Sequence, residues 1–407
     1  MKLTHLKTLH EPSDAIAAVT SVTFSPNNQK LAVVTADRVV HVYDEAGERR
    51  DRFSTKPAVK GAKSYIVTGM AWSPNSGMLA IAQSDNIVFV YNLGVEWGEK
   101  KSICNKFPQS QAVTCITWPS EHPQEVVFGT AEGKMKVGQL KTNKALTMYT
   151  TGSYTVSTCS SPDGHAVLSG HADGSIYAFY FDEGGRGPVH SKFTQHMCAP
   201  VCLGWGSSVI VAGADRRVSF YSVDGSIERT HAPAEDDDSI RAFTSIAVNP
   251  SGESVVLGNF DKLLTYTFNA RSEDWLPGPV KDIPNLYTAT SLAWRADGSR
   301  VALGSLCGGV DVFDAALRRV RYQGKFEFTY VSLSQVIVKR LSSGMRIVLR
   351  SSFGCEITRI NVYQDRFLVA NTVETLLLGD LASCNLSEIP WTPTPGEKCA
   401  WCTGRGS

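Results

Sequence analysis

One pattern recurs along most of this 407-residue chain and restricts the folds open to it. The stretch FSPNNQKLAVVTADRVVHVYD begins at Phe24, and WSPNSGMLAIAQSDNIVFVYN begins at Trp72 with the same turn and the same apolar runs. The residue before the Ser-Pro-like turn marks each repeat: Phe24, Trp72, Trp118, Ser160, Trp205, Val248 and Trp294. The intervals are 48, 46, 42, 45, 43 and 46 residues. A period of about 40–45 residues is typical of propeller blades, each of which is a four-stranded sheet.

The residues inside one repeat predict strands. Val19–Phe24 alternates between apolar and polar residues, Lys30–Thr35 is almost continuously apolar, and Arg38–Asp44 is rich in β-branched and aromatic residues. Proline, asparagine, aspartate and glycine fill the turn between the first two strands, and no stretch has a helical period. We therefore predict an all-β chain with a seven-bladed β-propeller over residues 1–325, because seven such sheets can stack around an axis and close.

Two segments compete for the strand that closes this ring. Leu3–Leu9 lies before the first repeat mark and would join the two ends of the propeller. Arg318–Gly324 lies after the last repeat and fits the same position. The sequence leaves both alternatives open.

A second register follows each mark by about thirteen residues, where the second strand turns into the third. It holds Asp37, Asp85, Glu132, Asp173, Asp215 and Asp261, with Cys307 in the last repeat. A carboxylate in such a turn can accept hydrogen bonds from nearby backbone N–H groups. We interpret these six acidic residues as structural turn residues, in preference to a ring of metal ligands.

The period breaks after the seventh repeat. Three short strands are expected between Phe326 and Ser351, and Glu356–Leu381 resembles one more blade. We predict a partial second propeller of about two blades over residues 326–391 and a disordered Pro/Gly-rich tail over residues 392–407. Closed propellers need four or more blades. We therefore expect either that the chain stops inside a second propeller or that this region pairs with the first ring.

Composition excludes several classes of function. The chain has 40 basic and 39 acidic residues, so it lacks the basic excess of a general nucleic-acid binder. No apolar run approaches the roughly 20 residues that span a membrane, and the N-terminus does not resemble a secretory signal. The 10 scattered cysteines are expected to be reduced thiols of a cytosolic protein.

No motif in the chain predicts catalysis. Cys399 and Cys402 have the spacing of a zinc knuckle or a redox pair, but no second ligand pair stands at a suitable distance. His196, Cys198 and Cys202 could form a cluster, although they lie at the entry to a strand. The chain has no G-x-S-x-G elbow, and glycine-rich Gly184–His190 lacks the ending of a phosphate loop. We predict no enzyme activity, cofactor, metal or small-molecule substrate.

Charged clusters are the remaining features. Glu235–Asp238 is an acidic run that we interpret as a solvated loop. Basic clusters occur at Arg49, Arg50 and Arg52, at Arg216 and Arg217, and at Arg318, Arg319 and Arg321. On one face they could dock an acidic partner or anionic lipid; dispersed, they are ordinary surface charges, which the balanced net charge favours.

Several longer strings carry a more specific resemblance. The Trp-Asp signature of WD repeats is degraded to Tyr43-Asp44 and Phe313-Asp314, and Tyr91-Asn92 departs further. The distinctive strings are DEAGERRDRFSTKP, EWGEKKSICNKF, LSGHADGSI, GSLCGGVDVFD, KFEFTYVSLSQVIVKRLSSGMRIVL and ETLLLGDL. Together they resemble the N-terminal WD-repeat region of the intraflagellar transport 172 family, peripheral subunits of intraflagellar transport complex B. The resemblance extends from Lys2 to about Trp391.

This resemblance implies tandem propellers that dock other complex B subunits, including a calponin-homology domain, and that also contact membranes peripherally. It implies a non-enzymatic scaffold for cilium assembly and axonemal transport, at the cilium or flagellum and the basal body, with a cytoplasmic pool. Two alternatives remain open: a membrane-coat-like module that binds lipid surfaces, and a propeller hydrolase with a central metal.

Overall fold

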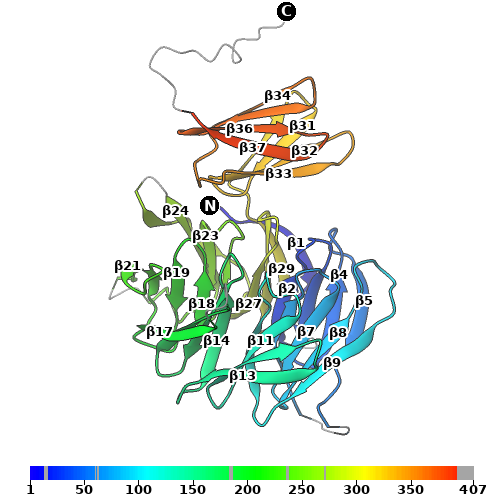
Figure 1. The fold of residues 1–407 in the computed structure, drawn as a ribbon, viewed down its shortest axis with the longest axis vertical. Helices are drawn as coiled ribbons and strands as arrows, with labels where there is room; N and C mark the ends of the chain where they lie inside the picture. The colour runs from blue at the N-terminus through cyan, green and yellow to red at the C-terminus, as the bar shows by residue number, and fades with distance from the viewer. Residues whose placement is uncertain are drawn as a thin grey trace, which may run out of the picture. The chain divides into compact units, whose positions relative to one another are not determined.

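The structure is a computed structural model that describes residues 1–12, 17–59, 61, 64–182, 187–234, 238–269 and 272–391. These residues form strands and turns and no helix, which confirms the all-β prediction. The same residues therefore offer no helix that is long and apolar enough to cross a membrane. The chain divides into two compact units, Met1–Ala315 and Ala316–Ser407 (Figure 1).

The described part of the first unit contains seven antiparallel sheets, six of which follow the chain in order. The first sheet holds β2 (Val19–Phe24), β3 (Leu31–Thr35), β4 (Val39–Tyr43) and β5 (Arg49–Ser54), and the second holds β6 (Val67–Trp72), β7 (Met78–Gln83), β8 (Ile87–Asn92) and β9 (Ser102–Pro108). The third holds β10 (Val113–Thr117), β11 (Glu125–Thr130), β12 (Lys134–Gln139) and β13 (Lys144–Thr150), and the fourth holds β14 (Thr155–Ser160), β15 (Ala166–His171), β16 (Ser175–Tyr180) and β17 (Val189–Gln195).

The last three sheets of the unit keep the same antiparallel order. The fifth holds β18 (Cys202–Trp205), β19 (Val209–Ala212), β20 (Val218–Tyr221) and β21 (Ile227–His231). The sixth holds β22 (Ser245–Val248), β23 (Ser254–Gly258), β24 (Lys262–Asn269) and β25 (Asp274–Pro277), with short β26 (Lys281–Asp282) also paired to β24. The seventh holds β27 (Ala289–Trp294), β28 (Arg300–Ser305) and β29 (Val310–Asp314), and β1 (Thr4–His10) from the chain start is its fourth strand.

Burial explains the sequence pattern of each strand. The second strands are buried on both faces, as all five residues of β3 show, which accounts for their continuous apolar runs. The fourth strands are largely exposed and carry the charged residues, as in β5 and β21. Position within the sheet therefore decides the polarity of each strand.

The Ser-Pro-like turns are closed by the serine itself. Ser25 N–H donates to Lys30 O over 2.8 Å, and Ser25 Oγ accepts from Lys30 N–H at 2.9 Å. The hydroxyl also donates to Asn27 Oδ1 at 2.7 Å. Ser73 forms the same set of bonds in the second sheet. The recurring serine and Asx side chains thus satisfy the backbone of this turn.

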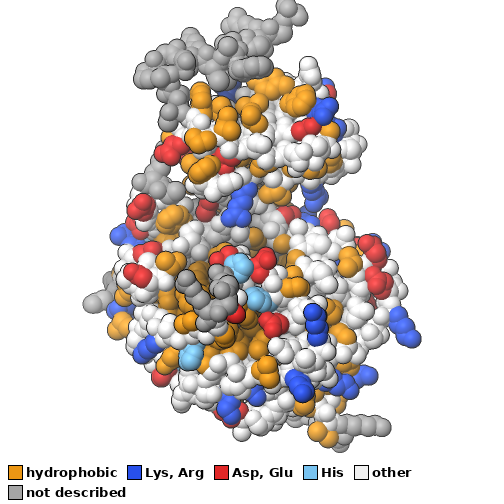
Figure 2. All heavy atoms as spheres, in the orientation of Figure 1, with side chains coloured by type: hydrophobic (Ala, Val, Ile, Leu, Met, Phe, Trp, Pro, Cys, Tyr) orange, Lys and Arg blue, Asp and Glu red, His pale blue; other side chains and the backbone are white. Residues whose placement is uncertain are grey.

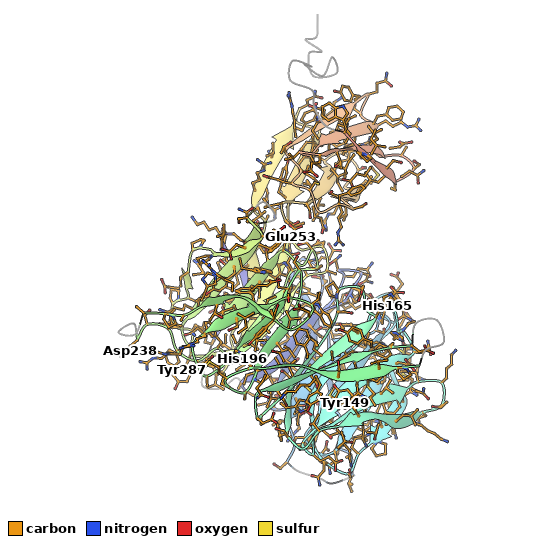
Figure 3. The ribbon with its side chains drawn as sticks, turned by 60° about the vertical axis from the view of Figure 1, so that its left-hand side comes forward. Tyr149, His165, His196, Asp238, Glu253 and Tyr287 are labelled. Carbon is orange, nitrogen blue, oxygen red and sulfur yellow. The ribbon has the colours of Figure 1, made fainter. Side chains whose placement is uncertain are left out.

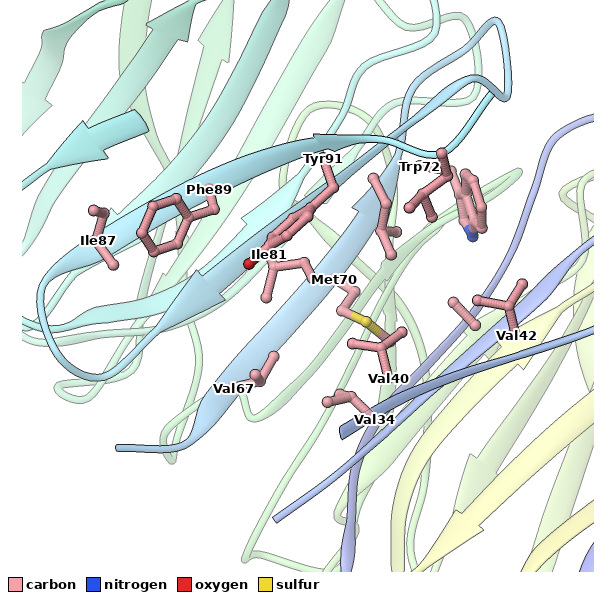
Figure 4. Packing of buried hydrophobic residues seen from close by; sticks show 13 residues of the cluster. Val34, Val40, Val42, Val67, Met70, Trp72, Ile81, Ile87, Phe89 and Tyr91 are labelled. Atoms are coloured by element: carbon pink, nitrogen blue, oxygen red, sulfur yellow. The ribbon is translucent and has the colours of Figure 1, made fainter. Parts of the chain in front are cut away.

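The sheets of the first unit contact one another in a closed order. Each first strand contacts the first strand of the next sheet, and β27 of the seventh sheet contacts β2 of the first. Seven apolar clusters likewise join consecutive sheets, including one between the seventh sheet and the first. In the cluster of Figure 4, side chains of β6–β8 such as Trp72 and Met70 pack against Val40 and Val42 of β4.

The question of the closing strand is resolved in favour of the N-terminal segment. β1 pairs antiparallel with β29, with Thr4 opposite Asp314 and His10 opposite Val310. β30 (Arg318–Tyr322), the competing segment, pairs with β31 (Phe326–Tyr330) of the second unit. The division therefore falls after Ala315, and the boundary that we predicted after residue 325 is wrong because β30 belongs to the following sheet.

The second unit contains two four-stranded antiparallel sheets in its described part. The first sheet holds β30, β31, β32 (Gln335–Arg340) and β33 (Arg346–Arg350). The second holds β34 (Arg359–Tyr363), β35 (Phe367–Asn371), β36 (Thr375–Asp380) and β37 (Asn385–Pro390). One apolar cluster joins them, with Phe326 and Val338 from one sheet and Ile360 and Leu377 from the other. The predicted tail, residues 392–407, lies outside the described residues.

Candidate functional site

The loops at one end of the first unit contain the acidic turn residues and the segment with His196 and Cys198. In each antiparallel sheet, the loop before the first strand and the turn between the second and third strands lie at the same end. Neighbouring sheets meet with these ends together: Thr68 Oγ1 at the start of β6 donates to Val113 O at the start of β10 over 2.9 Å. Thr244 Oγ1 just before β22 donates to Ala289 O at the start of β27 over 2.6 Å. We call this end of the unit the loop face.

The acidic register lies in the turns of the loop face. The residue after the carboxylate has a positive φ in five of the six turns: Arg38 at 69°, Asn86 at 70°, Gly133 at 78°, Gly174 at 85° and Arg216 at 61°. Glycine adopts this conformation without strain, and asparagine tolerates it. The two arginines are bulkier than the position favours.

The six acidic side chains form different hydrogen bonds and ion pairs in these turns. Asp37, Asp173 and Asp215 each accept a backbone N–H two residues further on, at 3.2, 3.0 and 3.3 Å. Asp85 instead accepts Ala58 N–H at 2.7 Å and so ties the preceding loop to its turn. The last two form ion pairs, Glu132 with Lys134 at 3.0 Å and Asp261 with Lys262 at 3.6 Å.

Beneath the loop face, two sheets bond a tyrosine of the third strand to a histidine from a neighbouring segment: His10 ends β1, and His196 lies in the loop before β18. Tyr43 Oη lies 2.5 Å from His10 Nε2, and Tyr221 Oη lies 2.8 Å from His196 Nδ1. Burial raises the pKa of Tyr43 to about 12 and lowers the pKa of His10. Both pairs therefore stay neutral at pH 7 and serve as buried hydrogen-bond links. The sequence does not reveal these pairs, because the partners are 33 and 25 residues apart along the chain.

The fourth sheet buries a longer polar network. Ser169 Oγ lies 2.8 Å from Tyr149 Oη and 2.8 Å from His171 Nε2. The other ring nitrogen of His171 lies 3.0 Å from Thr151 Oγ1 and 3.1 Å from Ser153 O. Burial raises the pKa of the Tyr149 phenol and lowers the pKa of His171. The network fixes the loop before β14 against β15, and it holds no exposed nucleophile.

Of His196, Cys198 and Cys202, which the sequence allowed to form a cluster, only the first two lie together. Cys202 is fully buried in β18, where it packs in an apolar cluster with Phe220 and Ile210. His196 and Cys198 instead lie beside Asp215. The sequence analysis placed Asp215 only in the turn register and gave no sign that it would meet these two residues. Cys399 and Cys402 lie outside the described residues.

The basic clusters do not come together. Arg49, Arg50 and Arg52 lie on β5, the outer strand of the first sheet, where Arg50 forms an ion pair with Asp44 at 2.6 Å. Arg216 and Arg217 lie in the turn before β20 of the fifth sheet; Arg216 pairs with Asp238 at 3.6 Å. Arg318, Arg319 and Arg321 lie on β30 of the second unit, where Arg318 stacks on the Tyr330 ring at 3.9 Å. Basic side chains are scattered among acidic and neutral ones on the face in Figure 2.

Exposed apolar side chains, by contrast, concentrate on the loop face. Eighteen exposed large apolar residues belong to the described part of the first unit, and nine of them lie in its loop face. These nine are Val59, Ile66, Tyr154, Met197, Val201, Phe260, Val280, Tyr287 and Leu306. The opposite end carries six: Val95, Trp97, Tyr180, Val189, Val223 and Ile227. Figure 3 labels His196, Asp238 and Tyr287 near one edge of the unit and His165 and Glu253 away from it.

Two of these loop-face residues form a preformed aromatic pair. The rings of Phe260 and Tyr287 meet edge to face with centroids 4.8 Å apart. Such pairs hold each ring in one orientation before any partner arrives. The loop face thus offers rigid apolar area framed by turn carboxylates, which is chemistry for non-covalent binding.

Comparison with known proteins agrees with this arrangement. The family described as WD domain, G-beta repeat matches residues 3–44, and the anaphase-promoting complex subunit 4 WD40 domain matches residues 51–121. An intraflagellar transport protein 172 homolog of Danio rerio is 51% identical over 98% of this chain. The intraflagellar transport protein 172 of Chlamydomonas reinhardtii is 49% identical over 98%, and the homolog of Homo sapiens is 50% identical over 98%.

In each of these three comparisons the chain spans 23% of the relative's length. The similarity covers sheets and loops of both units alike, and the matched repeats are WD repeats. The resemblance inferred from the sequence is confirmed: over nearly its whole length the chain is similar to part of intraflagellar transport protein 172.

Proposed function

We propose that the first unit is a closed seven-bladed WD-repeat propeller that serves as a non-enzymatic docking scaffold in intraflagellar transport. The observation that carries this proposal is the concentration of exposed apolar side chains on the loop face, where half of those in the unit gather. Phe260 and Tyr287 are in direct contact there, and contiguous exposed apolar area of this kind marks interaction sites. In this proposal the chain supports cilium assembly and transport along the axoneme.

The closed order of sheet contacts supports the seven-bladed interpretation. Seven sheets share seven apolar clusters, and β1 adds the start of the chain to the sheet that holds its last strands. A ring joined in this way presents its loops in fixed positions. Rigid loops lower the conformational entropy that partner binding would otherwise cost.

The partners in this proposal are other subunits of complex B, among them a calponin-homology-domain subunit. The chain would then be found at the cilium or flagellum and at the basal body, with a cytoplasmic pool. Binding by apolar contact requires no reactive group, in keeping with a scaffold. The lipid-surface alternative has less support, because the basic clusters that it requires lie on an outer strand, in a turn of another sheet and in a different unit.

For the second unit we propose the first two blades of a second propeller. Its sheets have the same order as those of the first unit, and they share one core. Exposed apolar residues lie on the later sheet, including Phe367, Leu378, Leu386 and Ile389. In this proposal further sheets, or another protein, cover them.

Co-precipitation from ciliated cells tests the proposed function. The tagged chain is expected to concentrate in cilia and to capture complex B subunits. The double variant Met197→Asp/Tyr287→Asp, which charges the loop face, is expected to lose that capture. Val223→Asp, at an equally exposed position on the opposite end of the fifth sheet, is the matched control and should retain it. Capture that is equal for both variants would contradict docking through the loop face.

A further inference from the structure

Three side chains of different chemistry converge where the loop before β18 meets the turn before β20. His196 Nε2, Cys198 Sγ and a carboxylate oxygen of Asp215 all lie within 4.8 Å of one another. His196 Nε2 and Asp215 Oδ2 are 3.6 Å apart, which is too long for a hydrogen bond. Histidine nitrogen, cysteine sulfur and carboxylate oxygen are the three ligand types that zinc binds in proteins.

Two of these ligand atoms are buried and have no partner. The His196 side chain is only 2% exposed, and neither its Nε2 nor Asp215 Oδ2 has a hydrogen-bond partner. A buried polar atom left unsatisfied costs about 1–3 kcal/mol. A bound ion that contacts both atoms would remove this unfavourable free energy.

The second ring nitrogen of His196, Nδ1, has a hydrogen-bond partner that suits a metal-bound histidine. Its Nδ1 lies 2.8 Å from Tyr221 Oη. The tyrosine oxygen can accept a hydrogen bond from Nδ1–H, and this tautomer leaves the lone pair of Nε2 free. Metal-bound histidines usually have a hydrogen-bond partner of this kind on the second nitrogen, which fixes the tautomer and the ring orientation. Tyr221 is thus placed as an outer-shell partner.

The geometry fits a small tetrahedral ion. Two nitrogen or oxygen ligands at about 2.0–2.1 Å from a tetrahedral zinc lie roughly 3.3–3.4 Å apart. The distance of 3.6 Å between His196 Nε2 and Asp215 Oδ2 is close to that value. A hard ion such as Mg²⁺ or Ca²⁺ would instead prefer oxygen ligands only.

We propose that His196, Cys198 and Asp215 form a Zn²⁺ site at the loop face. The ion takes three protein ligands, and its fourth position opens towards solvent because Cys198 and Asp215 are only partly buried. Binding converts the Cys198 thiol to a thiolate and releases one proton. The site ties the loop before β18 to the turn before β20 and so fixes the loop that carries Met197, whose side chain is 79% exposed.

The test is titration of the full chain with Co²⁺, which reports a thiolate ligand by a sulfur-to-metal charge-transfer band, followed by displacement with Zn²⁺. The tail cysteines could bind metal themselves, so every protein carries Cys399→Ser and Cys402→Ser. We expect one Co²⁺ per chain with a charge-transfer band that Zn²⁺ abolishes. Cys198→Ser should remove the band, whereas Cys307→Ser, in the turn of the seventh sheet that corresponds to the Asp215 turn, should not.

A second variant separates ligand loss from misfolding. Tyr221→Phe removes only the outer-shell hydroxyl, and it should weaken metal binding about 10–100-fold while the charge-transfer band remains at saturating Co²⁺. The absence of a band in the parent protein, or a band that survives Cys198→Ser, would overturn the site.

Discussion

The two units use the same four-stranded sheet and differ in what covers its faces. In the first unit every sheet packs against two neighbours, since seven apolar clusters join seven sheets. In the second unit one cluster joins two sheets. Of 27 exposed large apolar residues in the described part of the chain, nine lie in residues 316–391, although that segment is much the shorter of the two.

This difference shows that the sheet is not a self-sufficient element. Its second strand is apolar on both faces, so a sheet with one neighbour leaves apolar area in water. Closure removes this problem in the first unit, and β1 is the strand that links the chain start to the last sheet. The predictions below separate the effect of closure from that of packing within each sheet.

The largest effect is expected from removal of a closing strand. Deletion of residues 1–10 exposes the edge of β29 and removes buried Leu3 from the cluster between the sixth and seventh sheets. We expect the loss of most of the roughly 5–15 kcal/mol that stabilises a typical domain, with faster hydrogen exchange in all seven sheets of the first unit. Deletion of Asn385–Pro390, the outer strand of the second unit, is the matched control. Exchange that increases only in the seventh sheet would show that closure is not cooperative.

Single core residues test whether each unit unfolds separately. Trp275 is 1% exposed, stacks on Phe220 at 4.7 Å and donates its indole N–H to Ser208 Oγ at 2.9 Å. Trp275→Ala should cost about 3–5 kcal/mol and lower the melting transition of the first unit alone. Phe326→Ala should lower that of the second unit by a similar amount. Calorimetry in which both variants shift one common transition would contradict separate unfolding.

Buried polar networks give the next comparison. Ser169→Ala leaves both Tyr149 Oη and His171 Nε2 without their shared partner, at an expected cost of about 1–3 kcal/mol. In the second unit, Ser351→Ala removes one of three donors to Glu388, which keeps Thr375 Oγ1 at 2.6 Å and Ser352 N–H at 2.5 Å. It also removes the acceptor of Cys355 N–H at 3.1 Å, but Cys355 is partly exposed and can bond to water instead. Urea unfolding should therefore show the smaller loss for Ser351→Ala, and equal losses would refute the argument.

Acid should affect the first unit at a higher pH than the second, because all nine histidines precede residue 232. Burial lowers the pKa of His41 to about 4 and also lowers the pKa values of His10, His171 and His196. A group with a depressed pKa stabilises the fold above its unfolded value of about 6.5, and this stabilisation is lost as the pH falls towards the folded value. We expect the first unit to lose about 1–3 kcal/mol between pH 6.5 and 4.

The second unit should keep its stability over most of that range. Hydrogen bonds lower the pKa of Glu388 against the opposing effect of burial, so its contribution is lost only below about pH 4.5. Hydrogen exchange, corrected for intrinsic rates and followed peptide by peptide, measures the two units in one sample. A second unit that loosens first on acidification would contradict this order.

The smallest effect is expected at a strained turn. Arg216 has a φ of 61°, and its ion pair with Asp238 at 3.6 Å is exposed. Arg216→Gly should relieve backbone strain and lose little electrostatic energy, so the change should lie between neutral and about 1 kcal/mol of stabilisation. A loss of more than about 1 kcal/mol in chemical unfolding would show that the ion pair matters more than the strain.

Local sequence signals predicted the strands and turns well. The Ser-Pro-like turns and the acidic turns are each made by residues a few positions apart, so the chain segment itself specifies them. The choice between Leu3–Leu9 and Arg318–Gly324 depends on long-range pairing with β29, and the sequence could not decide it. The approach of Asp215 to His196 and Cys198 also joins separate segments, so only the fold reveals it.

Titration calorimetry of the full chain against the calponin-homology domain of the complex B partner tests the central claim most directly. We expect saturable binding that Met197→Asp/Tyr287→Asp abolishes and Val223→Asp leaves unchanged. No binding by a folded chain, or binding that Val223→Asp abolishes and the loop-face variant retains, would contradict docking of this partner through the loop face.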